Sequence, residues 1–346
     1  MRFLLAVFIM LGGLVAADAA SWNDFRKKPD EWFKTDEAKA IAANVLAWQT
    51  EQGDWPNDND SFAPFKPDAK TKQGTFDDGH TTHEARFLVR MFAATGREEY
   101  RDAALKAIDL VMDSQYGNGG FPQQARPTEK YPKYITFNDR TMVNLLELLR
   151  DVSTRDEFNF AGDDRRLIAG RQVDAGVRCI LASQIRMGNS LQVWGAQHDE
   201  RTLAPRPARA FEPASFASAE SADVLVFLMS FENPSPEVID AVDAGFAWFQ
   251  RTQLRGIRVE KSDGDAIVVR DPSAPPIWAR FYDLNTMRPM FAGRDGVVKS
   301  TLAEIDQERR TGYAWFGNWG EKVVKSYAKW PDRPKASSDV VPPDAK

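Results

Sequence analysis

Residues 113–123 read DSQYGNGGFPQ and follow an apolar stripe at helical spacing. The stripe places apolar side chains at positions 100, 104, 107, 108, 111 and 112, which lie on one helix face. Gly117, Gly119, Gly120 and Pro122 follow at once, and glycine and proline commonly end helices. The stretch therefore predicts a helix that ends near residue 113 and a loop after it.

Similar short sequences recur along the chain. They are TEQGDWP at 50–56, ASQIRMGN at 182–189 and RTQLRG at 251–256. The interval from Gln115 to Gln184 equals the interval from Gln184 to Gln253. The interval from Gln52 to Gln115 is slightly shorter. A period of this length fits a pair of helices plus a long loop, the unit of an α/α toroid or of a helical solenoid.

Helical periodicity dominates the remaining sequence. Apolar stripes and loop positions predict further helices over 81–95, 140–150, 173–181, 218–231 and 238–249. Only GIRVEKSDGDAIVVRD, residues 256–271, indicates a β-hairpin, with residues 262–265 as its turn. The predicted fold class is mainly α with one small β-hairpin insertion.

Composition indicates a soluble globular protein, with 43% hydrophobic and 27% charged residues among 346. The net charge of −5 gives no reason to expect nucleic acid as a partner. Basic residues nevertheless gather over 280–310, where they form either a site for an anionic substrate or a solvated face. They are Arg280, Arg288, Arg294, Lys299, Arg309 and Arg310.

The N-terminus has the pattern of a secretory signal peptide. Arg2 precedes an apolar run over residues 3–15, and Ala17-Asp18-Ala19 fits a cleavage site after Ala19, so we expect a secreted or periplasmic protein. The sequence contains no second apolar stretch of the kind that would predict a membrane span. Cys179 is the only cysteine, and its place in a helical pattern indicates a core residue. The polar, proline-rich residues 331–346 predict a disordered tail.

Two of the three histidines lie within TFDDGHTTHEARF, residues 75–87. Zinc-protease motifs place two histidines four residues apart on an established helix. His80 and His83 are three apart and straddle a helix start, which does not fit that geometry. Thr81 and Glu84 instead fit a capping box, which leaves His83 exposed in the first turn.

Asp77 and Asp78 precede this cap and are not needed for it. Adjacent carboxylates repel one another unless a cation or an arginine lies between them, and hard oxygen ligands suit calcium or magnesium. Asp139, about one repeat after Asp77, either caps the helix at Arg140 or joins Asp77 in one metal site. Equivalent loops of a toroid gather at one end, which would bring these groups and the loop with Arg209 to one cleft.

The chain resembles the pectate lyases of polysaccharide lyase family 10 in a set of short motifs that occur in the family's order. The motifs are GDWP (53–56), TFDDG (75–79), NGGFPQ (118–123), YITFND (134–139), WGAQHD (194–199), LAPRPARAFEP (203–213), WARFYDL (278–284), GRDG (293–296) and GYAWFGNW (312–319). They cover roughly residues 45–330. The resemblance implies one catalytic domain, 20–330, folded as an incomplete α/α toroid in two lobes with a long substrate cleft. The chain departs from the family at Asp78, where asparagine is common.

The resemblance also implies calcium-dependent cleavage of polygalacturonate by anti β-elimination, which yields 4,5-unsaturated oligogalacturonides. From the match to the family's motifs, Asp77 and Asp139 would hold the calcium ion, with Asp78 beside them. Arg209 would abstract the C5 proton, although a free guanidinium has a pKa of roughly 12.5 or more, so neighbours would have to lower it. Read from the residues alone, Arg209 instead forms a structural ion pair with Glu212.

Substrate binding is implied for Arg280, Arg294 and Lys299, because guanidinium and ammonium groups suit acidic sugars. Asp199 is expected at the cleft. His198 is either a base, which its loop position allows, or a hydrogen-bonded structural histidine, the alternative that the sequence favours. The expected partner is a polygalacturonate or oligogalacturonide, with no nucleic acid and no membrane, and the protein is expected to be a monomer.

Two other functions fit parts of the sequence. An inverting glycoside hydrolase would use two carboxylates, Asp77 or Asp139 with Glu212, about 6.5–9.5 Å apart. A non-catalytic oligogalacturonate-binding protein of the periplasm would bind without turnover. A lyase alone forms an ultraviolet-absorbing product and is inhibited by a chelator.

Overall fold

The computed structural model describes residues 22–66, 73–127, 130–262 and 264–330. The predicted signal peptide and C-terminal tail both lie outside these residues. Within the described part of the chain, no helix combines the length and the apolar character that a bilayer crossing requires.

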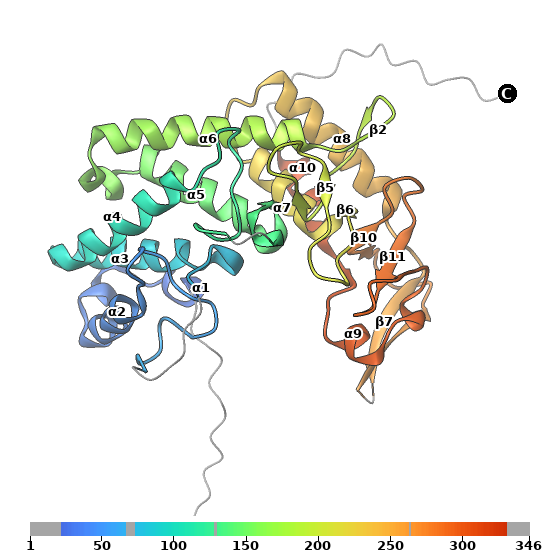
Figure 1. Ribbon diagram of the computed structural model, residues 1–346, viewed down its shortest axis with the longest axis horizontal. Coiled ribbons are helices and arrows are strands. Elements are labelled where there is room, and N and C mark those ends of the chain that lie inside the picture. Colours follow the sequence, from blue (N-terminus) through green and yellow to red (C-terminus); the bar gives the residue numbers. More distant parts are fainter. Residues whose placement is uncertain (1–21, 67–72, 128–129, 263, 331–346) are drawn as a thin grey trace, which may run out of the picture.

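Helices form most of the regular structure, so the mainly α prediction is confirmed (Figure 1). The α-helices are α1 (Trp22–Phe25), α2 (Asp36–Trp48), α3 (Thr82–Thr95), α4 (Glu98–Asp113), α5 (Thr141–Thr154), α6 (Asp163–Ser183), α7 (Ser218–Leu228), α8 (Pro236–Thr252), α9 (Gln307–Thr311) and α10 (Trp319–Lys329). Short 3-10 helices are η1 (Asp30–Lys34), η2 (Asp77–Gly79), η3 (Tyr131–Lys133), η4 (Asn138–Arg140), η5 (Asp156–Ala161) and η6 (Leu302–Glu304).

The repeat is built into the hydrogen bonds at the ends of α2, α4 and α6. Gln49, Gln115 and Gln184 each follow one of these helices, at nearly equal spacings along the chain. The side-chain amide of each glutamine donates to a carbonyl of its own loop and to a carbonyl of the next long helix. The acceptors on the next helix are Ala103 (2.9 Å), Gln172 (2.9 Å) and Ala241 (3.0 Å). The first member of the repeat is therefore Gln49, and the assignment to Gln52 was wrong.

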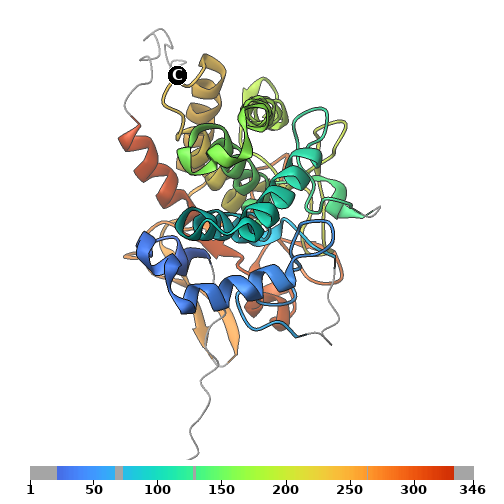
Figure 2. The ribbon, with the colours of Figure 1, turned by 90° about the vertical axis from the view of Figure 1, so that its left-hand side faces the viewer.

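The intervening helices α3, α5 and α7 each pack against the helix that follows, as the hairpins α3–α4, α5–α6 and α7–α8. Figure 2 shows the helices of these hairpins in successive layers. The apolar face of α5 includes Leu145, Leu146 and Leu149, all fully buried as the stripe predicts. Cys179 on α6 is also buried in this core, which raises the pKa of its thiol to about 12. The thiol is thus protonated at neutral pH.

The C-terminal part adds more sheet than the sequence predicts. The strands are β1 (Ile135–Thr136), β2 (Arg186–Met187), β3 (Ser190–Leu191), β4 (Gln197–His198), β5 (Pro205–Arg206), β6 (Phe216–Ala217), β7 (Ile257–Ser262), β8 (Asp265–Arg270), β9 (Trp278–Ala279), β10 (Phe281–Tyr282), β11 (Pro289–Ala292), β12 (Val298–Lys299) and β13 (Phe316–Gly317). The hairpin β7–β8 is confirmed. The prediction that it is the only sheet was wrong, because two-residue strands show no alternation.

One four-stranded sheet, in the order β12-β11-β10-β6, carries a second hydrophobic core. Phe281, Phe291 and Trp315 are buried there, apart from the larger core of the helices. Strand β6 runs directly into α7, so this sheet is joined to the helical part at the start of that helix. The charged residues of the candidate site come from both parts.

Replacement of Gln184 by alanine is expected to lower the free energy of unfolding by about 2–3 kcal/mol, because two buried carbonyl groups lose their donor. Gln253 occupies the same place after α8, but its amide donates only to the carbonyl of Gln250. The matched Gln253→Ala variant should lose less than about 0.5 kcal/mol. Urea unfolding followed by circular dichroism measures both, and equal losses would contradict the role of Gln184.

Candidate active site

Two turns with the same backbone shape precede α3 and α5. Their sequences are TFDD at 75–78 and TFND at 136–139, and η2 packs against η4. Asp78 has φ 52° and Asp139 has φ 48°, in the left-handed region that aspartate and asparagine tolerate better than most residues. Asp78 is therefore the structural equivalent of Asp139, and Asp77 is the equivalent of Asn138.

The carboxylates of these turns lie near one another. Burial and the negative charge of Asp139 raise the pKa of Asp77 to about 6, and Asp78 adds to this effect. The Oδ1 atom of Asp77 is buried and has no hydrogen-bond partner among the described residues. Burial and Asp139 also raise the pKa of Asp78. The turns thus gather like charges that a cation would stabilise.

Arg280 faces this group from the residue between β9 and β10. One terminal nitrogen lies 2.5 Å from the buried Glu220 carboxylate, 3.1 Å from Asn138 Oδ1 and 3.8 Å from Asp139 Oδ1. Its guanidinium also lies 4.9 Å from the ring centre of Tyr313. Burial opposes the charge, but Glu220 and the other neighbours hold the pKa of Arg280 above its usual range. Arg280 is therefore a fixed cation beside Asp139.

Arg209 forms a two-point ion pair with Glu212, one bond of which, from Nε to Oε2, measures 2.7 Å. Tyr313 donates its hydroxyl to the same carboxylate at 2.8 Å. The hydrogen bonds that Arg209 donates to Glu212 raise the pKa of Arg209 above its usual range, opposite to the lowering that a base needs. The side chain is 45% exposed and its charge acts on Asp77, so Arg209 borders the carboxylate group.

The other predicted substrate residues have different surroundings. Arg294 is exposed and pairs with Glu308 at 2.8 Å, and its loop approaches that of Arg209, since a Cβ on Gly296 would lie 3.6 Å from the Ala210 carbonyl oxygen. Lys299 lies on β12 opposite Phe291. Among the contacts of the described residues, none joins Arg294 or Lys299 to the carboxylates of the two turns.

Asp199 has a role in a turn. Its carboxylate accepts hydrogen bonds from the backbone of Arg201 and Thr202 and lies 3.2 Å from Arg206. These bonds lower the pKa of Asp199. The carboxylate is thus engaged within its own loop, and the position of Asp199 at the cleft stays a prediction.

The stretch at 75–87 corrects the capping-box prediction. The Thr81 hydroxyl donates to the Thr75 carbonyl instead of capping α3, and Thr81 itself has φ 70°. Glu84 is buried, accepts a bond from Ser61 at 2.6 Å and lies 3.4 Å from His80. His83 is half-buried and not exposed as predicted, and this burial lowers the pKa of His83 to about 4.

His198 is a structural histidine. Its Nε2 accepts a hydrogen bond from the Gly195 amide at 2.9 Å, and its Nδ1 lies 2.8 Å from the Leu203 carbonyl oxygen, which assigns the proton to Nδ1. Burial is the main reason that the pKa of His198 falls to about 4. Protonation would place two donors, Nε2–H and the Gly195 amide, against each other. This is the alternative that the sequence favoured.

Acid should therefore destabilise the protein through His198. The folded pKa of about 4 lies below the unfolded value of 6.5, so the unfolded chain binds the extra proton first and stability falls between pH 6.5 and 4. Between pH 7 and pH 5 the loss from this group is about 2 kcal/mol. The variant His198→Gln retains an acceptor for Gly195 but has no imidazole to protonate. In urea unfolding, its free energy of unfolding should therefore fall by about 2 kcal/mol less than that of the wild type between pH 7 and pH 5. An unchanged pH dependence would exclude His198 as the cause.

Glu220 and Asn138, which contact Arg280, were not predicted from the sequence. Glu220 is 2% exposed and lies in the first turn of α7, a position where acidic residues are common on any helix. Asn138 could have been found from the sequence, because aligning TFND with TFDD pairs it with Asp77. That alignment was the available signal.

The pectic acid lyase family model matches residues 49–324, which include both turns, Arg209, Glu220 and Arg280. The chain belongs to the pectic acid lyase family. The prediction of a pectate lyase, an enzyme of the polysaccharide lyase class, is thereby confirmed. None of the curated proteins compared with the chain matches it.

Two solved structures from Cellvibrio cellulosa are similar to this pectic acid lyase chain. One is a family 10 polysaccharide lyase with 34% identity and a TM-score of 0.79, covering 87% of this chain and 96% of its own. The other is an aspartate-to-alanine mutant of a family 10 polysaccharide lyase in complex with trigalacturonic acid. It has 33% identity and a TM-score of 0.79, covering 88% of this chain and 97% of its own.

Proposed function

We propose that the protein cleaves polygalacturonate by calcium-assisted anti β-elimination and releases 4,5-unsaturated oligogalacturonides. The observation that carries the proposal is the meeting of two equivalent aspartate turns with two arginines, Arg280 and Arg209, in a pectic acid lyase chain. A relative with 33% identity is described in complex with trigalacturonic acid, which supports an oligogalacturonide as the substrate.

The aspartate turns fit a calcium ion in part. Asp77 offers a buried oxygen without a partner, and Asp139 lies close enough to raise its pKa. Within the described residues, no three His, Cys, Asp or Glu side chains form a group that could hold a metal ion. Because calcium takes 6–8 oxygen ligands, Asp77, Asp139 and Asp78 would hold it together with waters and substrate carboxylates. When bound, calcium would neutralise the uronate carboxylate and so make the C5 proton more acidic.

The arginines supply the remaining chemistry in this proposal. Arg280, held by Glu220 and Asn138, would bind and orient a uronate carboxylate through its guanidinium. Arg209 would accept the C5 proton as the C4–O4 bond breaks and a C4–C5 double bond forms, while water protonates the departing oxygen. Because Glu212 keeps Arg209 protonated, the pair must open and Arg209 must lose its proton before it acts.

The arrangement of the whole chain is part of the proposal. The stacked hairpins α3–α4, α5–α6 and α7–α8 support the predicted incomplete α/α toroid in two lobes. The long cleft, with Arg294 and Lys299 as further subsites, is proposed to lie between them. Secretion to the periplasm or the exterior and a monomeric state complete the proposal.

Metal removal tests the function directly. We expect the wild-type protein to raise the ultraviolet absorbance of a polygalacturonate solution that contains calcium, and we expect excess chelator to stop the rise. Added calcium should restore it. An inverting hydrolase would release reducing ends without the absorbance, and a binding protein would do neither. A wild-type protein that gives no absorbance rise would overturn the proposal.

A further inference from the structure

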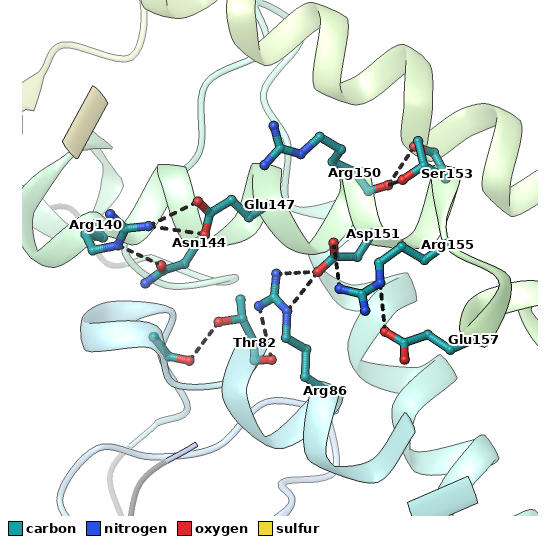
Figure 3. Close-up of polar contacts among 12 residues, drawn as sticks. Thr82, Arg86, Arg140, Asn144, Glu147, Arg150, Asp151, Ser153, Arg155 and Glu157 are labelled. Atoms are coloured by element: carbon teal, nitrogen blue, oxygen red, sulfur yellow. Dashed lines mark hydrogen bonds and ion pairs between the residues drawn. The ribbon is translucent and has the colours of Figure 1, made fainter. Parts of the chain in front are cut away.

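A charged groove runs along α5 away from the two turns (Figure 3). Asn144, Glu147 and Asp151 follow one another at spacings of three and four residues, so they share one face of α5. Arg140, the last residue of η4, joins this face through bonds to Asn144 and Glu147. Arg86 reaches this face from α3, with its Nε 3.1 Å from an Asp151 oxygen. At 1.5 Å per residue, the face extends about 20 Å from the η4 turn.

Two cavities open along this face and meet. The first, of about 500 Å³, reaches the turns at Asp78 and Asp139. The second, of about 240 Å³, reaches Arg155 beyond the end of α5. Both are lined by four of the same residues, which are Trp22, Arg26, Arg86 and Asp151. They therefore form one groove that begins at the proposed metal site and leads away from it.

The groove carries uncompensated positive charge. Its basic lining residues are Arg26, Lys27, Arg86, Arg90, Arg140, Arg150 and Arg155. Apart from the two turn aspartates, its carboxylates are Glu147, Asp151 and Glu157, and each is already paired with an arginine of the groove. Arg26, Lys27 and Arg150 form no ion pair with any described residue, although the whole chain has a net charge of −5. The groove is thus suited to a polyanion.

The wall that holds Arg26 and Lys27 is firmly attached. It consists of α1 and the residues that follow, ahead of residue 49, where the family match begins. Phe25 is 6% exposed and packs on Phe87 of α3 with ring centres 5.3 Å apart. Trp22 is half-buried at the groove, where an indole face can pack against a sugar ring. The segment therefore adds a fixed basic wall to the enzyme.

We propose that this groove binds uronate units of the polymer beyond those at the cleavage site, so that the enzyme favours long polygalacturonate over short oligomers. The inference rests on the proposed function, because it takes the two turns as the place of cleavage. Carboxylates that repeat along the polymer would meet Arg26, Lys27 and Arg150 in turn. The alternative is a solvated network of surface ion pairs, which would contribute little to binding.

The test uses Arg26→Glu/Lys27→Glu and, as a matched control, Arg171→Glu/Arg178→Glu, which makes the same charge change on exposed positions of α6. For the groove variant we expect the ratio of the polymer KM to the trigalacturonate KM to rise about tenfold. The control should stay within twofold of the wild type. Measuring the ratio makes the trimer an internal check that the variant is folded.

A second measurement needs no turnover. Electrophoresis in gels that contain polygalacturonate should retard the wild type and the control but not the groove variant. If the wild type cleaves the polymer and the groove variant keeps both the KM ratio and the retardation of the wild type, only the proposal for the groove is overturned. A wild type that is retarded without cleaving overturns the proposed function, while loss of retardation in the groove variant still supports the groove.

Discussion

Replacement of Arg209 by lysine is expected to lower kcat on polygalacturonate about 10³-fold. A positioned general base contributes typically 10²–10⁴-fold, and lysine keeps the positive charge but cannot reproduce the two-point contact that fixes the guanidinium on Glu212. Initial rates of ultraviolet absorbance at saturating calcium and substrate measure this loss. The folded state should survive, because the side chain is 45% exposed.

Arg206→Lys is the matched control for this variant. Arg206 lies three residues away at the end of β5 and pairs with Asp199 at 3.2 Å, and among the described residues it forms no ion pair with the charged groups around Asp139. Its replacement should change kcat less than threefold. If Arg209 is only a structural partner of Glu212, Arg209→Lys will also leave kcat within threefold and will lower stability instead, which denaturant unfolding of the same samples detects.

Glu212→Gln separates the two roles further. Glu212 raises the pKa of Arg209, so removing its charge should let Arg209 lose its proton at lower pH. The rising limb of the profile of kcat/KM against pH should then move toward lower pH. A limb that stays in place would argue that Arg209 is not the group whose deprotonation starts the reaction.

The helical framework was predictable because it depends on local patterns. Apolar stripes placed α3, α5, α7 and α8 within a few residues, although α6 begins ten residues before its predicted start at 173, and helix-ending words at a regular spacing revealed the repeat. The hydrogen bonds explain why the words recur, since each glutamine must reach the next helix. Gln49 and Gln52 both lie near the end of α2, and it is the bond to Ala103 that identifies Gln49 as the member of the repeat.

The site was harder to predict because it depends on contacts between distant segments. Glu220 and Arg280 are 60 residues apart, and nothing in their own neighbourhoods shows that they meet. The paired strands β6 and β10, which bring them together, contain two residues each, too few for a pattern. The capping-box prediction was wrong because of another contact between distant segments. Glu84 accepts a hydrogen bond from Ser61 and does not cap the start of α3. Family resemblance supplied what local reasoning could not.

The two turns allow a matched comparison of Asp139→Asn with Asp78→Asn. Both substitutions keep one side-chain oxygen and a residue that tolerates positive φ, so the backbone should be unaffected. Each removes one negative charge from the same group. Differences in activity or calcium dependence between the two variants therefore report which carboxylate serves the metal and the arginine.

We expect Asp139→Asn to lower kcat/KM about 100-fold and to raise the calcium concentration for half-maximal activity at least tenfold, because metal sites lose about this much when their ligands are poorly supported. Asp139 acts on Asp77 more strongly than Asp78 does and also lies 3.8 Å from Arg280. For Asp78→Asn we expect kcat/KM and the calcium requirement to stay within threefold of the wild type, since Asp78 acts on Asp77 more weakly than Asp139 does and the asparagine keeps an oxygen that can bind calcium. Calcium titrations of the absorbance rate measure both variants. Equal losses would show that the metal is held symmetrically by the two turns, and a larger loss in Asp78→Asn would transfer the ligand role from Asp139 to Asp78.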